Sequence, residues 1–172
     1  VLIYYAGHGL RDETTGRGYW LPVDAETDSA ANWIANHDIA DLLQALAARH
    51  ALVVADACFS GALTRNAGAQ LDSRATVLQR LAARRSRAVL SSGGLEPVLD
   101  SGGGRHSVFA RALADVLGAQ GEALEAGRVF NAVRERVVRN AEQTPQYAPL
   151  HEAGHDGGEF IFTPLAVNNN GR

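Results

Sequence analysis

The chain has 172 residues, of which 46% are hydrophobic, and this size suits one domain with a full core. The net charge of -3 excludes a strongly basic surface for nucleic acid or for anionic membranes. No apolar stretch reaches the roughly 18 residues that span a bilayer, and no signal peptide opens the chain.

The first part of the chain predicts two buried strands with a hairpin loop and a helix between them. The apolar runs at residues 1–6 and 51–57 are typical of buried strands, and residues 10–32 are polar and turn-rich around a short apolar patch, which favours a small hairpin. A helix begins at Asn36, which can cap it. Its predicted apolar stripe consists of Ile39, Leu42, Leu43 and Leu46.

The second part predicts a loop at residues 64–73, a helix at 74–85, a strand at 87–92 and a glycine-rich loop at 95–105. Ser107 can cap the next helix, whose apolar positions are Val108, Phe109, Ala112, Leu113, Val116 and Leu117. A further helix carries Val129, Phe130, Val133 and Val137, and residues 157–164 predict a fourth strand. Strands that alternate with helices indicate an α/β fold with a mostly parallel sheet covered on both faces.

Residues 1–165 are predicted to form one domain, followed by a polar tail or linker at 166–172. The chain has no methionine and begins inside an apolar run, so we expect it to be part of a longer polypeptide. All 16 basic residues are arginine, which suggests GC-rich, bacterial coding. One cysteine cannot form an internal disulfide, so we expect a cytoplasmic location.

Two reactive side chains follow the two apolar strands of the first part. His8 comes after the first strand and Cys58 after the second, and a right-handed crossover would bring both to the same edge of the sheet. An imidazolium near a thiol lowers the thiol pKa from about 8.5 and makes the sulfur a nucleophile. The backbone N–H groups of Gly9 and Cys58 could then hold an oxyanion. The alternative is that His8 and Cys58 are core residues.

The stretches YYAGHG and DACFSG resemble the histidine and cysteine motifs of caspase-like cysteine peptidases, and their spacing is similar to that of caspases. The aspartate two residues before the cysteine is closer to metacaspases and bacterial orthocaspases. The resemblance implies a three-layer α/β sandwich that here lacks its N-terminal strands. It implies His8 as general base, Cys58 as nucleophile, and Gly9 and Cys58 as oxyanion donors. Ala6 stands where the family often has serine.

The resemblance also implies that Asp56 lines the pocket for the residue before the scissile bond. A carboxylate there prefers arginine, or lysine as second choice, although Asp56 could instead bond only to backbone groups. Further substrate-binding candidates are Glu96, Ser91 and Ser92, with Asp100 weaker. We therefore predict an endopeptidase that cleaves after arginine through a thioacyl-enzyme. Its expected partners are a peptide or protein substrate, the missing N-terminal segment, and regulatory domains or an activating partner.

The sequence leaves three other interpretations open. An inactive binding or scaffold module would keep the fold without the chemistry. HEAGH at residues 151–155 matches a zinc-peptidase motif, but its proline and glycine neighbours favour a loop. We expect no metal or other cofactor: calcium activation occurs in some metacaspases, yet the acidic stretch at 12–28 lacks EF-hand spacing.

Self-cleavage after Arg65 or Arg74 is predicted because both lie in a polar connector.

Overall fold

A four-stranded sheet forms the centre of the computed structural model, which describes residues 1–26, 28–57, 74–93 and 106–165. The strand order is β1 (Leu2–Ala6), β5 (His50–Asp56), β6 (Ser86–Ser91) and β8 (Gln146–Pro149). β1, β5 and β6 are parallel, and β8 is antiparallel to β6. The mostly parallel sheet predicted from the alternation of strands and helices is confirmed.

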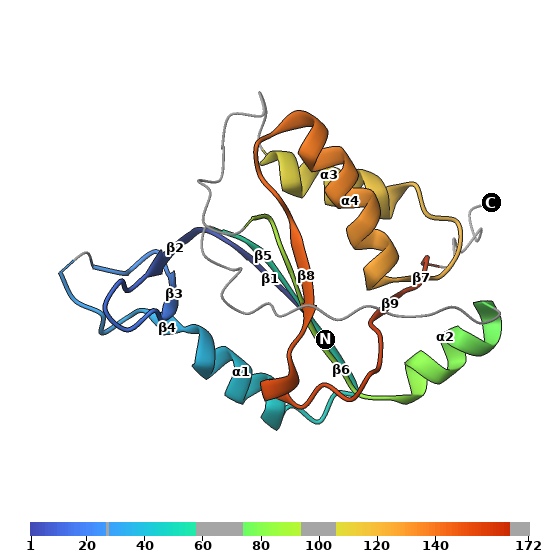
Figure 1. The fold of residues 1–172 in the computed structure, drawn as a ribbon, viewed down its shortest axis with the longest axis horizontal. Helices are drawn as coiled ribbons and strands as arrows, with labels where there is room; N and C mark the ends of the chain where they lie inside the picture. The colour runs from blue at the N-terminus through green and yellow to red at the C-terminus, as the bar shows by residue number, and fades with distance from the viewer. Residues whose placement is uncertain (27, 58–73, 94–105, 166–172) are drawn as a thin grey trace, which may run out of the picture.

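Helices cover both faces of this sheet, which confirms the predicted α/β sandwich (Figure 1). On one face α3 (Val108–Gly118) and α4 (Ala126–Asn140) pack against Leu52, Val54 and Leu90. On the other face α1 (Asn36–Ala45) packs against Val53 and Ala55. The alternating residues of β5 therefore serve two separate cores. Within the part of the chain that the structure describes, no helix is long and apolar enough to cross a membrane.

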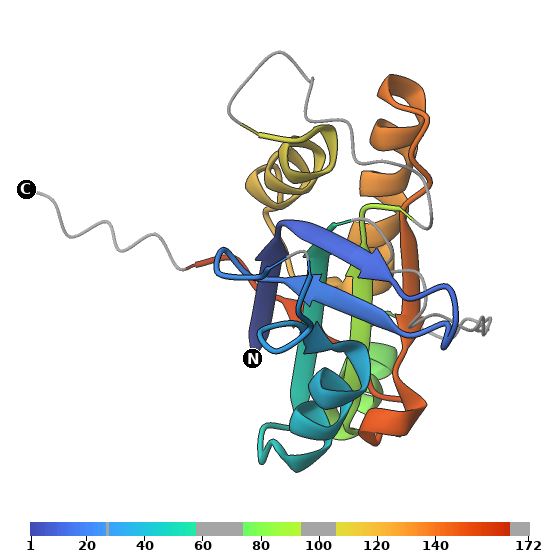
Figure 2. The same ribbon diagram turned by 90° about the vertical axis from the view of Figure 1, so that its left-hand side faces the viewer.

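A second, three-stranded antiparallel sheet follows β1 directly. It consists of β2 (His8–Arg11), β3 (Gly18–Leu21) and β4 (Ile34–Ala35), and it lies beside β1 and α1 (Figures 1 and 2). Its turn is held by Asp12, whose carboxylate accepts hydrogen bonds from the backbone N–H groups of Thr14 and Thr15. The hairpin expected in this region is present, and it begins earlier than predicted, at His8.

Three details of the sequence-based prediction were wrong. Ala35, not Asn36, is the N-cap of α1, and no side chain caps it, because β4 runs directly into the helix. Leu42 does not belong to the buried stripe, since 68% of it is exposed. The strand expected at 157–164 is reduced to β9 (Ile161–Phe162), which pairs with β7 (Leu124–Glu125) outside the central sheet.

The fourth strand of the central sheet, β8, was not predicted. It is four residues long and ends in Pro149, so it carries neither a long apolar run nor a clear alternation. The predicted helix at 74–85 is present as α2 (Arg74–Ala83), and Ser107 caps α3 as expected by accepting a hydrogen bond from Ala110 N at 2.9 Å.

Arg87 is fully buried at the start of β6, although arginine is rarely found in a core. Its guanidinium donates five hydrogen bonds of 2.7–3.1 Å to backbone carbonyls, which belong to Leu43, Leu46, Ala48, Arg49 and Ser86. Two of these carbonyls lie at the C-terminal end of α1, where a cation also offsets the helix dipole. Arg87 thus fastens the end of α1 to the central sheet.

We predict that Arg87→Met destabilises the protein by about 3 kcal/mol or more, because several buried carbonyls lose their donors together. Urea unfolding measures this change. Arg139→Met is the matched control: Arg139 is mostly exposed on α4 and forms a surface ion pair with Glu135, so its loss should cost about 0.5 kcal/mol or less. Equal midpoints for the two variants would contradict the role given to Arg87.

Candidate active site

The parallel pairing of β1 with β5 brings two predicted site residues, His8 and Asp56, to the same edge of the central sheet. Ala6, the last residue of β1, is in register with Asp56, the last residue of β5. Gly7 N then donates a hydrogen bond of 3.3 Å to Asp56 O, and His8 follows directly. The prediction that the strands before His8 and Cys58 are parallel neighbours is confirmed.

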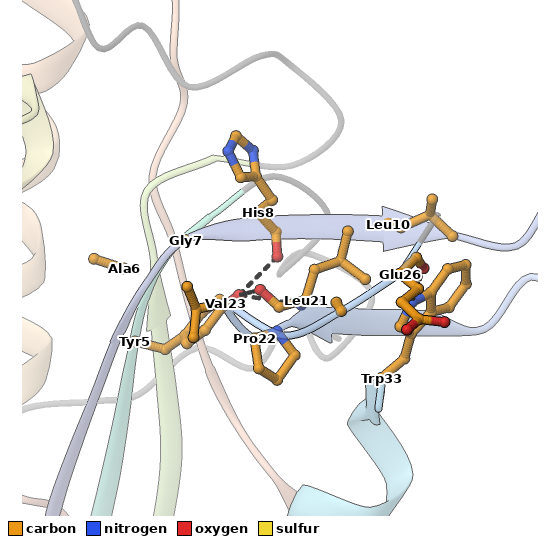
Figure 3. A pocket seen from close by; sticks show the side chains of 11 residues that line it. Tyr5, Ala6, Gly7, His8, Leu10, Leu21, Pro22, Val23, Glu26 and Trp33 are labelled. Carbon is orange, nitrogen blue, oxygen red and sulfur yellow. Dashed lines mark hydrogen bonds between the residues drawn. The ribbon is translucent and has the colours of Figure 1, made fainter. Parts of the chain in front are cut away.

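His8 is exposed, and its main chain is held by a tyrosine from the strand before it. The Tyr5 hydroxyl lies 2.7 Å from the carbonyl oxygen of His8, and it also bonds to the N–H and carbonyl of Leu21, the residue opposite His8 in the hairpin (Figure 3). The Tyr5 ring stacks on Trp20, with centroids 4.4 Å apart. Burial raises the pKa of Tyr5, so the hydroxyl keeps its proton.

Gly7 has no room for a side chain. A Cβ at this position would lie 2.6 Å from the Tyr5 hydroxyl oxygen and 2.8 Å from the ring carbon that carries it. Tyr5 cannot move aside cheaply, because its ring is stacked and its hydroxyl is bonded at the start of the hairpin. Gly7 is therefore required for the close contact that positions His8.

Asp56 is a buried carboxylate with one oxygen bonded and one oxygen unpaired. Only 6% of the residue is exposed. Its Oδ2 accepts hydrogen bonds from the hydroxyls of Ser107 and, at 3.5 Å, Tyr4. Burial and the Asp56 charge raise the pKa of Tyr4 to about 12, so this phenol stays a donor. The other carboxylate oxygen of Asp56, Oδ1, is buried and has no hydrogen-bond partner among the described residues.

Ser107 connects Asp56 to the start of α3. The same hydroxyl that donates to Asp56 accepts from Ala110 N in the first turn of the helix. The N-terminal end of a helix stabilises a nearby anion, so this arrangement offsets part of the cost of burying the carboxylate. The bond to Ser107 shows that Asp56 does not bond to backbone groups alone.

Ser91 and Ser92 lie at the carboxyl end of β6, next to the end of β5, and both are fully buried. The Ser91 hydroxyl donates to Gly93 O at 3.4 Å, and Ser92 N donates to Ala55 O at 3.0 Å. The Ser92 hydroxyl, like Asp56 Oδ1, is buried without a hydrogen-bond partner in the described part of the chain. Two unpaired polar atoms therefore lie at the ends of neighbouring strands.

Several predicted residues lie outside the described residues: Cys58, Glu96, Asp100 and Arg65. Ala57, the residue before Cys58, is buried at the end of β5. Arg74 is the first residue of α2. Gly9 is part of β2 and pairs with Trp20, so the hairpin fixes its backbone.

The zinc motif at residues 151–155 does not form the α-helix that such a motif needs. Residues His151–Ala153 form one turn of 3-10 helix, and Gly154 is left-handed with φ of 79°. His155 Nδ1 accepts a hydrogen bond of 3.1 Å from Arg87 N, which gives this histidine a structural role. The described residues contain no group of three or more side chains suited to a metal ion.

Sequence reasoning missed Tyr4, Tyr5 and Ser107. The sequence predicts a strand for both tyrosines. Because this strand is a continuous apolar run, its pattern does not show which of the two faces of the sheet each tyrosine occupies. Ser107 was found as a helix cap, yet its bond to Asp56 joins residues 51 positions apart in the chain.

Comparison with known families agrees with this geometry. Residues 1–152 match the family model of the caspase domain, which is most of the chain. The chain therefore belongs to the caspase domain family and, through it, to the cysteine peptidases in general. A search of curated protein sequences found no match.

We predict that Gly7→Ala lowers kcat by roughly 10- to 100-fold, because a displaced Tyr5 no longer fixes the start of the hairpin at His8. Steady-state kinetics on a cleaved peptide measures this loss, and the KM should change much less. In the control Gly121→Ala, the added Cβ meets no described atom within 4 Å, so activity should be unchanged. A fully active Gly7→Ala enzyme would show that the Tyr5 contact does not position His8.

Proposed function

We propose that this chain is an endopeptidase that cleaves peptide bonds after arginine, with Cys58 as nucleophile and His8 as the acid and base. The observation that carries the substrate assignment is Oδ1 of buried Asp56, which has no hydrogen-bond partner among the residues that the structure describes. A buried carboxylate oxygen without a donor is costly, and an incoming cation would supply the missing hydrogen bonds.

Arginine suits this place better than lysine. Oδ2 of Asp56 already accepts hydrogen bonds from Ser107 and Tyr4, so an incoming cation would bond to Oδ1, and the Ser92 hydroxyl at the end of the neighbouring strand is a candidate for a second acceptor. A guanidinium has several N–H donors in a fixed plane and can bond to two acceptors at once. The ammonium of lysine is a compact charge, and we assign it as the second choice.

The reaction follows from the roles of the two catalytic residues. The Cys58 thiolate attacks the substrate carbonyl carbon, and the backbone N–H groups of Gly9 and Cys58 bond to the resulting oxyanion. The His8 imidazolium gives its proton to the leaving nitrogen as the C–N bond breaks, which leaves a thioacyl-enzyme. His8 then takes a proton from water, whose oxygen attacks the thioester and releases Cys58.

We predict that Asp56→Asn lowers kcat/KM for arginyl peptides by a factor of tens or more, and far less for peptides with a neutral residue there. The asparagine carbonyl can keep the bonds from Ser107 and Tyr4, while its NH₂ replaces the free acceptor at Oδ1 with a donor that repels a guanidinium. Kinetics on a matched pair of peptides measures both values.

Two controls complete this test. Asp41→Asn makes the same chemical change on the exposed side of α1 and should leave both rates unchanged. Cys58→Ala should abolish cleavage while the melting temperature stays the same. Equal losses on both peptides would show that Asp56 serves the fold, and full activity without Cys58 would refute the cysteine mechanism. A folded wild-type chain without activity would identify a scaffold module instead.

A further inference from the structure

A pocket of about 660 Å³ lies beside His8, and the mechanism above does not use it. One side of it is formed by the end of β1 and by His8 itself, and the other by the hairpin and the segment after β3 (Figure 3). Most of its lining is apolar and comes from Leu10, Leu21, Pro22, Val23 and Trp33. Glu26 contributes the carboxylate.

The walls of the pocket are held in place by hydrogen bonds and ring contacts. Trp33 Nε1 donates a hydrogen bond of 2.9 Å to Glu26 O, and the Trp33 ring meets Tyr19 edge to face. On the other side, Tyr5 bonds to both backbone groups of Leu21. Val23, in contrast, is fully exposed, so the pocket has an uncovered apolar residue at its wall. A preformed apolar pocket of this size suits a large side chain.

The pocket and Asp56 lie on opposite faces of the central sheet. Asp56 follows Leu52 and Val54 on the face covered by α3 and α4, and it bonds to Tyr4 of β1. Tyr5, the next residue, belongs to the core on the α1 face and lines the pocket. His8 follows at the edge between the two faces. A peptide bond placed at His8 therefore has Asp56 on one side and the pocket on the other.

We propose that this pocket binds the residue directly after the scissile bond and prefers a large aliphatic or aromatic side chain there. The inference rests on the proposed function, in which His8 protonates the leaving nitrogen, so the residue carrying that nitrogen lies against His8. The apolar walls of the pocket remove such a side chain from water, which corresponds to roughly a 10- to 100-fold preference over glycine. Glu26 disfavours an acidic residue at this position by charge repulsion.

The test is a peptide library incubated with the full chain and analysed by mass spectrometry. The residue before each cut reports on the proposed function, and the residue after it reports on the pocket. Only cuts that are absent with Cys58→Ala are counted. Val23→Glu places a second carboxylate at the pocket wall, and it leaves the fold intact because Val23 is exposed. Val138→Glu makes the same change at an exposed position of α4 and is the matched control.

We expect wild type and Val138→Glu to share an enrichment of large apolar residues after the cut, and Val23→Glu to reduce it at least about fivefold. Glu26→Gln should raise the share of acidic residues there. Unchanged enrichment in Val23→Glu, or none in wild type, would overturn the pocket assignment while cuts after arginine still support the proposed function. Apolar enrichment after cuts that do not follow arginine would overturn the arginine assignment alone. A library left uncut would overturn both.

Discussion

The pairing of β1 with β5 is the constraint on which the candidate site depends. The register places Ala6 opposite Asp56, and the bond from Gly7 N to Asp56 O extends this pairing beyond the end of β1. The chain then turns into the hairpin at His8, so the main chain alone places this residue beside the end of β5. A shift of the register by one residue would move Asp56 relative to His8 and reverse the faces of Tyr4 and Tyr5.

Two buried charged residues of this sheet, Arg87 and Asp56, differ in how completely they are hydrogen-bonded. The Arg87 guanidinium, at the start of β6, has five carbonyl partners, and four of them belong to α1 and the segment that follows it. Asp56, at the end of β5, is almost as deeply buried but has one oxygen without a partner in the described structure. A buried charge that has only a structural role is expected to have all its hydrogen bonds, because each unpaired polar atom costs free energy of folding. The incomplete bonding of Asp56 among the described residues supports the substrate-binding role that we propose for it.

Much of the fold could be predicted because β5 is an apolar run, the helices carry apolar stripes, and Ser107 caps α3. The common edge of the strands before His8 and Cys58 also followed from the sequence, since a helix between two such strands makes them parallel. β8 could not be found, because it has four residues, ends in Pro149 and buries only Ala148 completely. The bond between Ser107 and Asp56 could not be found either, because it depends on how α3 approaches the sheet.

Tyr5 contacts both the proposed catalytic residue His8 and the proposed specificity pocket. Its hydroxyl fixes the main chain at His8 and Leu21, and the same residue lines the pocket beside them. Gly7 is confined to glycine by this tyrosine, so neither position can change without the other. Val23 and Glu26, on the far wall of the pocket, are therefore positions where a substitution is expected not to disturb His8. In the proposed enzyme, substitutions at these two positions would change the preference for the residue after the scissile bond without lowering kcat, whereas a substitution at Tyr5 would alter both.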